Sequence, residues 1–205
     1  MRSTRAARNR ARNLSVTWFL QQLAIMVWTV GHSTHSLDDF ITMLRTHQIE
    51  AVVDVRRFPA SRRLPWFNAA PLEHSLEAEG IAYRWVPSLG GRRTPHPGSL
   101  NVAWRHPSFR GYADHMQTEE FAEGLFQLLM IAGGLRTAIM CAELLWWRCH
   151  RRLIADQLTA IGVQVSHIER TASAAAPHRL TPPARIVAGS LTYEEAAGGI
   201  PSVAV

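Results

Sequence analysis

Residues 137–158 read TAIMCAELLWWRCHRRLIADQL, and they combine an apolar run, a short turn and an amphipathic segment. The apolar run, 136–141, has the length of a buried β-strand, and the pattern over 148–161 predicts a helix. The stretch also holds both cysteines of the chain, Cys141 and Cys149. Because ligands of open α/β sheets bind outside the carboxyl ends of the strands, the turn between this strand and this helix is a candidate site.

Short apolar runs and amphipathic helices alternate along the rest of the chain. Strands are predicted at 26–31, 50–55, 81–86 and 163–168, and the first two are expected to be buried. Helices are predicted after the N-cap residues Ser36 and Thr118, each followed by acidic residues, and over 71–79, before Gly80. This alternation predicts a single three-layer α/β domain with a mainly parallel sheet of about five strands flanked by helices.

The domain is expected to span residues 26–170. Residues 1–25 contain five arginines and no acidic residue, so we interpret them as a disordered basic tail or as a misassigned start before Met26. Residues 171–205 predict a C-terminal arm that packs on the domain or trails from it, with short β elements at 185–187 and 191–193. Two segments rich in Arg, Pro and aromatic or Gly residues are predicted as loops, 56–68 and 87–111.

The positive charge of the chain is concentrated at its N-terminus. The formal net charge is +6, but residues 26–205 hold 17 arginines against 16 acidic residues. The domain is therefore close to neutral, and charge alone does not establish an anionic partner. All 22 basic residues are arginine, which argues against Schiff-base chemistry on a lysine.

The cysteine content and the N-terminal sequence predict a reducing compartment, the cytoplasm. The chain has two cysteines and no convincing export signal, because Gln21 and Gln22 interrupt the apolar stretch that follows the arginines. No run of about 18 or more apolar residues is present, so no membrane partner is expected.

Several reactive side chains follow the predicted strands at the edge where parallel strands end together. The first strand is followed by His32, the second contains Asp54 near its end, and the fourth ends at Cys141, just before Glu143. Cys149 and His150 begin the next helix. Because these carboxyl ends share one edge of the sheet, we expect a common site with five candidate catalytic residues: His32, Asp54, Glu143, Cys149 and His150.

The thiols allow more than one interpretation. Cys149 lies near a helix N-terminus beside Arg148, His150 and Arg151, a setting that favours a thiolate nucleophile or a redox thiol. The alternative is a small residue that packs the helix on the sheet. Cys141 ends an apolar strand and is expected to be a buried supporting thiol.

Three further interpretations of the cysteines are a metal site, a disulfide and a cysteine-phosphatase loop. Cys141, Cys149, His150 and His32 are possible ligands for zinc or iron, but the cysteine spacing is atypical, and no metal or cofactor is predicted. A disulfide would depend on geometry. A cysteine-phosphatase loop is rejected, because six residues separate Cys141 from Arg148 and none of them is glycine.

Arginines alternate with aromatic residues in the two predicted loops, as in proteins that bind nucleotides or single-stranded nucleic acid. The alternative is a solvated loop whose aromatic side chains cover the core. The candidate anion-binding residues are Arg56, Arg62, Arg63, Arg92, Arg93 and Arg151.

The chain resembles one protein family in several phrases that occur in order, including TVGHSTHSLDDF, VDVRRFPASRRLPWFN, LGGRRTPHPGSLN, WRHPSFRGYADHM and MCAELLWWRCHRRLIAD. These phrases are similar to the DUF488 family, and the resemblance covers about residues 26–195. It implies a single α/β domain without an established activity. Trp146 departs from the family pattern, which usually has proline there.

The leading functional hypothesis is an enzyme that acts on a nucleotide or nucleic acid. In this hypothesis the arginines bind the anion, and Cys149 with His150 supplies the chemistry. The alternatives are a nucleic-acid binding module without catalysis and a thiol redox or metal-binding protein. Oligomeric state is not predicted.

Overall fold

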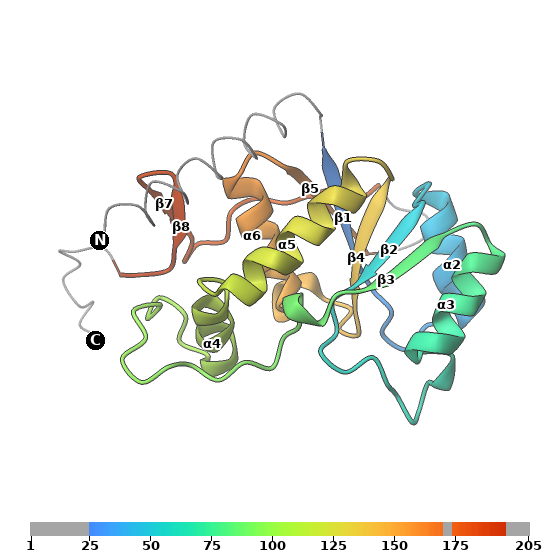
Figure 1. Cartoon of the computed structure of the whole chain (residues 1–205), viewed down its shortest axis with the longest axis horizontal. Coiled ribbons are helices and arrows are strands. Elements are labelled where there is room, and N and C mark those ends of the chain that lie inside the picture. The colour runs from blue at the N-terminus through green and yellow to red at the C-terminus, as the bar shows by residue number, and fades with distance from the viewer. Residues whose placement is uncertain (1–24, 170–173, 196–205) are drawn as a thin grey trace, which may run out of the picture.

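The computed structural model describes residues 25–169 and 174–195, and its centre is a mainly parallel β-sheet (Figure 1). Within these residues the sheet has six strands in the order β3-β2-β4-β1-β5-β6. The five predicted strands are β1 (Met26–Gly31), β2 (Ala51–Asp54), β3 (Ala82–Trp85), β4 (Thr137–Cys141) and β5 (Gln164–Ile168). All five run parallel, which confirms the predicted topology.

Helices cover both faces of the sheet, as Figure 1 shows. One apolar cluster joins β1, β2 and β4 to α2 (Leu37–Thr46) and α3 (Ala69–Ala78). A second cluster lies on the other face, beneath α4 (Pro107–His115), α5 (Glu119–Ala132) and α6 (Arg151–Ala160). Neighbouring residues of β4 belong to different clusters, Met140 to the first and Ile139 to the second, because side chains alternate across a strand. The three-layer α/β architecture is confirmed.

The predicted helix caps are present. The Ser36 hydroxyl accepts a hydrogen bond from the Asp39 amide at 3.0 Å, and the Thr118 hydroxyl accepts one from the Phe121 amide at 3.2 Å. Gly80 follows α3 with a φ of 73°, a conformation that glycine adopts without steric cost.

The segment between β4 and α6 differs from the prediction. The helix begins at Arg151 rather than at residue 148, and a 3₁₀ turn, η3 (Trp146–Arg148), precedes it. Cys149 has extended backbone angles, so it lies before the helix. Trp146 stacks on His167 with 3.9 Å between ring centroids, and this contact fixes the turn.

The segment predicted as a loop over 87–111 also contains regular structure. It begins with a 3₁₀ turn, η2 (Pro87–Leu89), and ends in the first turns of α4. Helix α4 carries proline at its first position and glycine inside, so its helical signal is weak, but burial of Tyr112 and Ala113 stabilises it. Another 3₁₀ turn, η1 (Pro65–Phe67), precedes α3, which begins two residues before the predicted start.

The described part of the C-terminal arm packs on the domain. A short strand that the sequence did not predict, β6 (Ala176–Pro177), pairs antiparallel with β5. The predicted β elements form a hairpin of β7 (Arg185–Val187) and β8 (Ser190–Thr192), the second one residue earlier than expected. The interpretations of residues 1–24, 170–173 and 196–205 fall outside the described residues. In the part of the chain that the structure describes, no helix is long and apolar enough to span a membrane.

Candidate active site

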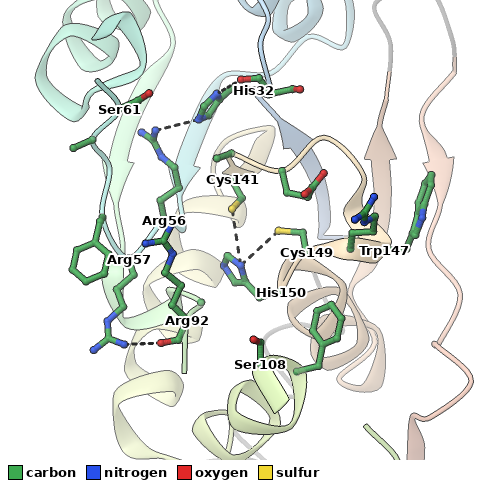
Figure 2. Close-up of a pocket in the computed structure, with 18 of the residues that line it drawn as sticks. His32, Arg56, Arg57, Ser61, Arg92, Ser108, Cys141, Trp147, Cys149 and His150 are labelled. Atoms are coloured by element: carbon green, nitrogen blue, oxygen red, sulfur yellow. Dashed lines mark hydrogen bonds between the residues drawn. The ribbon is translucent and has the colours of Figure 1, made fainter. Parts of the chain in front are cut away.

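The carboxyl ends of β1, β2 and β4 meet as expected, and a pocket of about 800 Å³ opens beside them (Figure 2). The pairing places Gly31 opposite Cys141 and Asp54 opposite Met140, so the residues that follow these strands are neighbours. The lining includes four of the five candidate catalytic residues, His32, Glu143, Cys149 and His150, together with Cys141. Asp54, which is fully buried, lies behind this wall and contacts Arg56.

His150 faces both thiols (Figure 2). Its Nδ1 lies 3.6 Å from the sulfur of Cys149 and 4.0 Å from that of Cys141. Its Nε2 lies 3.0 Å from the carbonyl oxygen of Val55, which can only accept a hydrogen bond, so Nε2 carries the proton. In the neutral ring Nδ1 is therefore an acceptor directed at the two sulfurs.

The imidazole of His150 is held in place by close packing. A Cβ added to Gly91 would lie 2.8 Å from Nδ1, so only glycine allows the backbone to approach the ring this closely. The fully buried ring of Tyr112 lies beside it, with 5.0 Å between centroids. Neither residue could be recognised as part of the site from its sequence position, because both act through a tertiary contact.

The two thiols have opposite electrostatic environments. Burial raises the pKa of Cys149, but the hydrogen bond from Cys141 and the electrostatic influence of His150 and Arg151 outweigh it, and the pKa lies well below its usual value. The hydrogen bond to Cys149, together with burial, holds the pKa of Cys141 well above its usual value. Both thiols are free, and a hydrogen bond from the Cys141 thiol to the Cys149 sulfur favours ionisation at Cys149 rather than at Cys141.

Arg151 supports the turn between β4 and α6. Its guanidinium is almost fully buried and donates to the carbonyl oxygens of Glu143 and Leu144, while its Nε lies 3.4 Å from the sulfur of Cys149. This position does not fit the predicted role in anion binding, because the guanidinium is already hydrogen-bonded inside the protein and does not line the pocket.

Asp54 and His32, two of the candidate catalytic residues, do not pair with each other as a base and its orienting carboxylate. The carboxylate of Asp54 accepts hydrogen bonds from Arg56 at 2.6 Å and from the Tyr83 hydroxyl at 2.7 Å. His32 accepts one from Arg56 at 3.2 Å on Nε2, and its Nδ1 donates to the Ser33 carbonyl at 3.0 Å. Arg56 thus stands between the two residues. Burial and the charge of Arg56 lower the pKa of His32 to about 4, so the ring is neutral and both nitrogens are engaged.

The predicted anion-binding arginines have different surroundings. Arg56 lines the pocket but is paired with Asp54, and Arg93 is paired with Glu120 at 2.9 Å. Arg62 and Arg63 are exposed, and neither is among the described residues that line the pocket. Arg92 is exposed, lines the pocket and has a φ of 58°; its carbonyl accepts a hydrogen bond from Arg57 at 2.9 Å.

Two further arginines belong to the pocket, Arg57 and Arg148, and both are exposed. Their position in the sequence pointed to the site, because Arg57 follows Arg56 and Arg148 precedes Cys149. Among the described residues that line the pocket, Glu143 is the acidic one, and its carboxylate accepts a hydrogen bond from the Leu145 amide at 3.2 Å. The lining also includes three aromatic side chains: Phe58, Phe109 and Trp147.

The same centre contains a possible set of metal ligands. Cys141, Cys149 and His150 each offer one donor atom, and these atoms lie within 4.8 Å of one another. Cysteine sulfur and imidazole nitrogen are the donors that zinc prefers.

Comparison with known proteins identifies the chain at the level of a family. No curated protein and no solved structure matches it. A family model described as a domain of unknown function, DUF488, matches residues 36–158. The match runs from the N-terminal cap of α2 into α6, so it includes both thiols, His150 and Asp54, whereas His32 precedes it. Because the match covers more than half of the sequence, including the thiol centre and the arginines of the pocket, the chain belongs to the DUF488 family.

Proposed function

We propose that this protein is a thiol-dependent enzyme that acts on a nucleotide or on a nucleotide of a nucleic acid. The observation that carries the proposal is the position of the Cys149 sulfur in the pocket wall. It lies between Nδ1 of His150 at 3.6 Å and Nε of Arg151 at 3.4 Å, and the pocket has arginines at its rim. A nucleophile, a base held by a third group and an anion-binding rim are the parts that such an enzyme needs.

The pocket lining supports a substrate that has both phosphate and an aromatic ring. Arg57, Arg92 and Arg148 are exposed at the lining and suit phosphate oxygens, because guanidinium groups bind them through two parallel hydrogen bonds. The aromatic lining residues are suited to stacking with a base. A volume of about 800 Å³ accommodates a small molecule or a single nucleotide rather than a duplex.

The proposed reaction begins with transfer of the Cys149 proton to Nδ1 of His150. The sulfur forms a bond to an electrophilic carbon of the substrate, and the bond from that carbon to the leaving group breaks. His150 returns the proton to the leaving group, while the Val55 carbonyl holds the ring in orientation. Arg151 and the Cys141 thiol stabilise the sulfur anion before the attack. Attack of water on the same carbon releases the product and restores the thiol.

The test combines Cys149→Ser with a separate measurement of binding. Wild-type protein and variant are incubated with a panel of mononucleotides and single-stranded oligonucleotides, and both turnover and affinity are measured. We expect the variant to lose turnover and retain affinity. Unchanged turnover in Cys149→Ser would contradict a catalytic thiol, and binding without turnover in both proteins would favour the nucleic-acid binding module instead.

The N-terminal arginines need their own control. Binding of the full chain and of a chain that starts at Met26 should be compared over a range of salt concentrations, because phosphate contacts weaken as salt rises. Binding that depends on the pocket is expected to persist in the shorter chain. We also propose the cytoplasm as the location, since two free thiols in contact with one histidine are maintained in a reducing compartment.

A further inference from the structure

We propose that Cys141, Cys149 and His150 together bind a soft divalent cation of the Zn²⁺ type, and that this ion reversibly blocks the thiol chemistry. The inference concerns regulation of the proposed active site, and its blocking effect rests on the proposed function. The binding itself rests on the positions of the three donor atoms alone.

The distances between the donor atoms fit tetrahedral coordination. An ion about 2.3 Å from sulfur and about 2.0–2.1 Å from nitrogen places these two atoms about 3.6 Å apart. The observed distances from Nδ1 of His150 are 3.6 Å to Cys149 and 4.0 Å to Cys141. The distance to Cys149 matches the tetrahedral value, and a small rotation of the Cys141 side chain would shorten the distance to Cys141 to the same value.

The surroundings of the donors resemble those of a metal ligand set. A histidine that binds zinc through one nitrogen usually donates the other N–H to a carbonyl or carboxylate, and His150 donates Nε2–H to Val55. Arg151 donates Nε–H to the Cys149 sulfur, which compensates part of the thiolate charge. Gly91 and Tyr112 fix the imidazole ring, so little reorganisation is needed when the ion binds.

The donor types select the class of ion. Two sulfurs and an imidazole favour Zn²⁺ and similar soft or borderline cations over Mg²⁺ and Ca²⁺, which prefer oxygen. Three protein ligands leave a fourth position for water. All three ligand residues line the pocket, so this position is reached from solvent.

Binding of the ion has a consequence for the proposed reaction. A sulfur that shares its lone pair with the cation is no longer available for attack on carbon. The metal-loaded protein is therefore expected to be inactive and slow to alkylate at Cys149, and a chelator should restore both properties.

The experiment uses the full chain, freed of metal with a chelator, and titrates it with Co²⁺ as a spectroscopic probe and then with Zn²⁺. We expect one Co²⁺ per chain, visible absorption typical of tetrahedral cobalt, and a near-ultraviolet sulfur-to-cobalt band that Zn²⁺ removes. Cys141→Ser, Cys149→Ser and His150→Gln should each weaken Co²⁺ binding by at least about tenfold, as loss of even a supporting contact does at metal sites. The matched control is His74→Gln, an exposed residue of α3, which should bind like the wild type.

The outcomes separate this inference from the proposed function. Absence of the sulfur-to-cobalt band, or equal binding by wild type and all three variants, overturns the metal site. Circular dichroism establishes that each variant is folded; if one is not, wild-type protein alkylated on both thiols replaces it and must lose Co²⁺ binding. Alkylation of the metal-free protein is measured in parallel. A metal site beside an unreactive Cys149 would contradict only the proposed reaction, and a reactive Cys149 without metal binding would contradict only the inference.

Discussion

At the scale of single residues, two histidines of the pocket differ in whether a ring nitrogen is free to accept a proton, and their hydrogen bonds explain the difference. His150 donates Nε2–H to Val55 and keeps Nδ1 directed at the thiols. His32 uses both nitrogens, one toward Ser33 and one toward Arg56, and its ring stacks on Phe67 with 4.1 Å between centroids. In the proposed reaction the base is therefore His150, and His32 has a supporting role.

Gly91→Ala tests the position of His150. The added methyl group would lie 2.8 Å from Nδ1 and 3.1 Å from Cγ of the ring, so the imidazole must move. A shift of this kind typically costs about 100-fold in rate, and we expect at least a tenfold loss in alkylation of Cys149 by iodoacetamide. Gly134→Ala is the control, because nothing lies within 4 Å of its added Cβ. Equal alkylation rates in the two variants would show that the ring does not activate the thiol.

His32→Gln tests the pH dependence of stability. Burial and Arg56 lower the pKa of His32 from 6.5 to about 4 in the folded protein. The unfolded chain takes up a proton below pH 6.5 while the folded protein does not, so stability falls as the pH drops from 6.5 toward 4. The contribution is on the order of 3 kcal/mol over this range. Urea denaturation at several pH values should give a shallower decline for the variant, and parallel curves for both proteins would rule the contribution out.

At the scale of elements, the strands were predictable and the connections were not. Runs such as MVWTVG and TAIMC are short, apolar and β-branched, and β1 has the predicted bounds. Helix α4 could not be predicted, because its sequence PSFRGYADH contains glycine and polar residues and its stability comes from packing. The start of α6 was misplaced for a similar reason: WWR forms a 3₁₀ turn, and Trp146 of this turn stacks on His167, a tertiary contact that the local sequence does not reveal.

The position of the candidate site at the carboxyl edge of the sheet was predictable, but the hydrogen bonds and ion pairs within it were not. The parallel topology brought His32, Cys141, Cys149 and His150 to one edge. The sequence does not reveal which arginines are free to bind an anion, because the pairing of Asp54 with Arg56 and of Arg93 with Glu120 is visible only in the structure. Arg151, a predicted anion ligand, instead supports the turn that carries Cys149.

Arg151→Lys tests the turn between β4 and α6. Lysine cannot reach both carbonyls and the sulfur with one planar group, so buried acceptors lose their donors. We expect a loss of about 2–3 kcal/mol in the free energy of unfolding, measured with urea. Arg62→Lys, an exposed arginine, is the matched control and should change stability little. An equal effect of both substitutions would contradict the role of Arg151 in the turn.

At the scale of the whole molecule, one buried carboxylate joins the C-terminal arm to the domain. Asp156 of α6 is fully buried and accepts hydrogen bonds from Thr181 at 2.6 Å and from Tyr193 at 2.9 Å. Nε2 of His178 lies 3.0 Å from the same carboxylate. A chain of hydrogen bonds runs on from His178 to His167, and from His167 to Thr29 of β1. The arm therefore contacts both the helix that follows the thiol centre and the central sheet.

Asp156→Asn tests this connection. The amide of asparagine has a donor where the carboxylate has an acceptor, so at least one hydrogen bond from the arm is lost inside the protein. We expect faster hydrogen exchange over 176–195 and a loss of about 1–3 kcal/mol in stability. Glu123→Gln, which removes an exposed charge from α5, is the control. Unchanged hydrogen exchange over 176–195 would mean that Asp156 does not stabilise the packing of the arm on the domain.

In the proposed function Cys149 is a reactive thiol beside an anion-binding rim, and competitive alkylation measures both properties in one experiment. Metal-free protein is treated with limiting iodoacetamide, with and without a mononucleotide, and each cysteine is quantified by mass spectrometry. The structure predicts that Cys149 is modified before Cys141, since Cys149 contacts both His150 and Arg151, and that the nucleotide slows its modification. Modification of Cys141 first, or a rate of Cys149 alkylation that no mononucleotide changes, would contradict the proposed function.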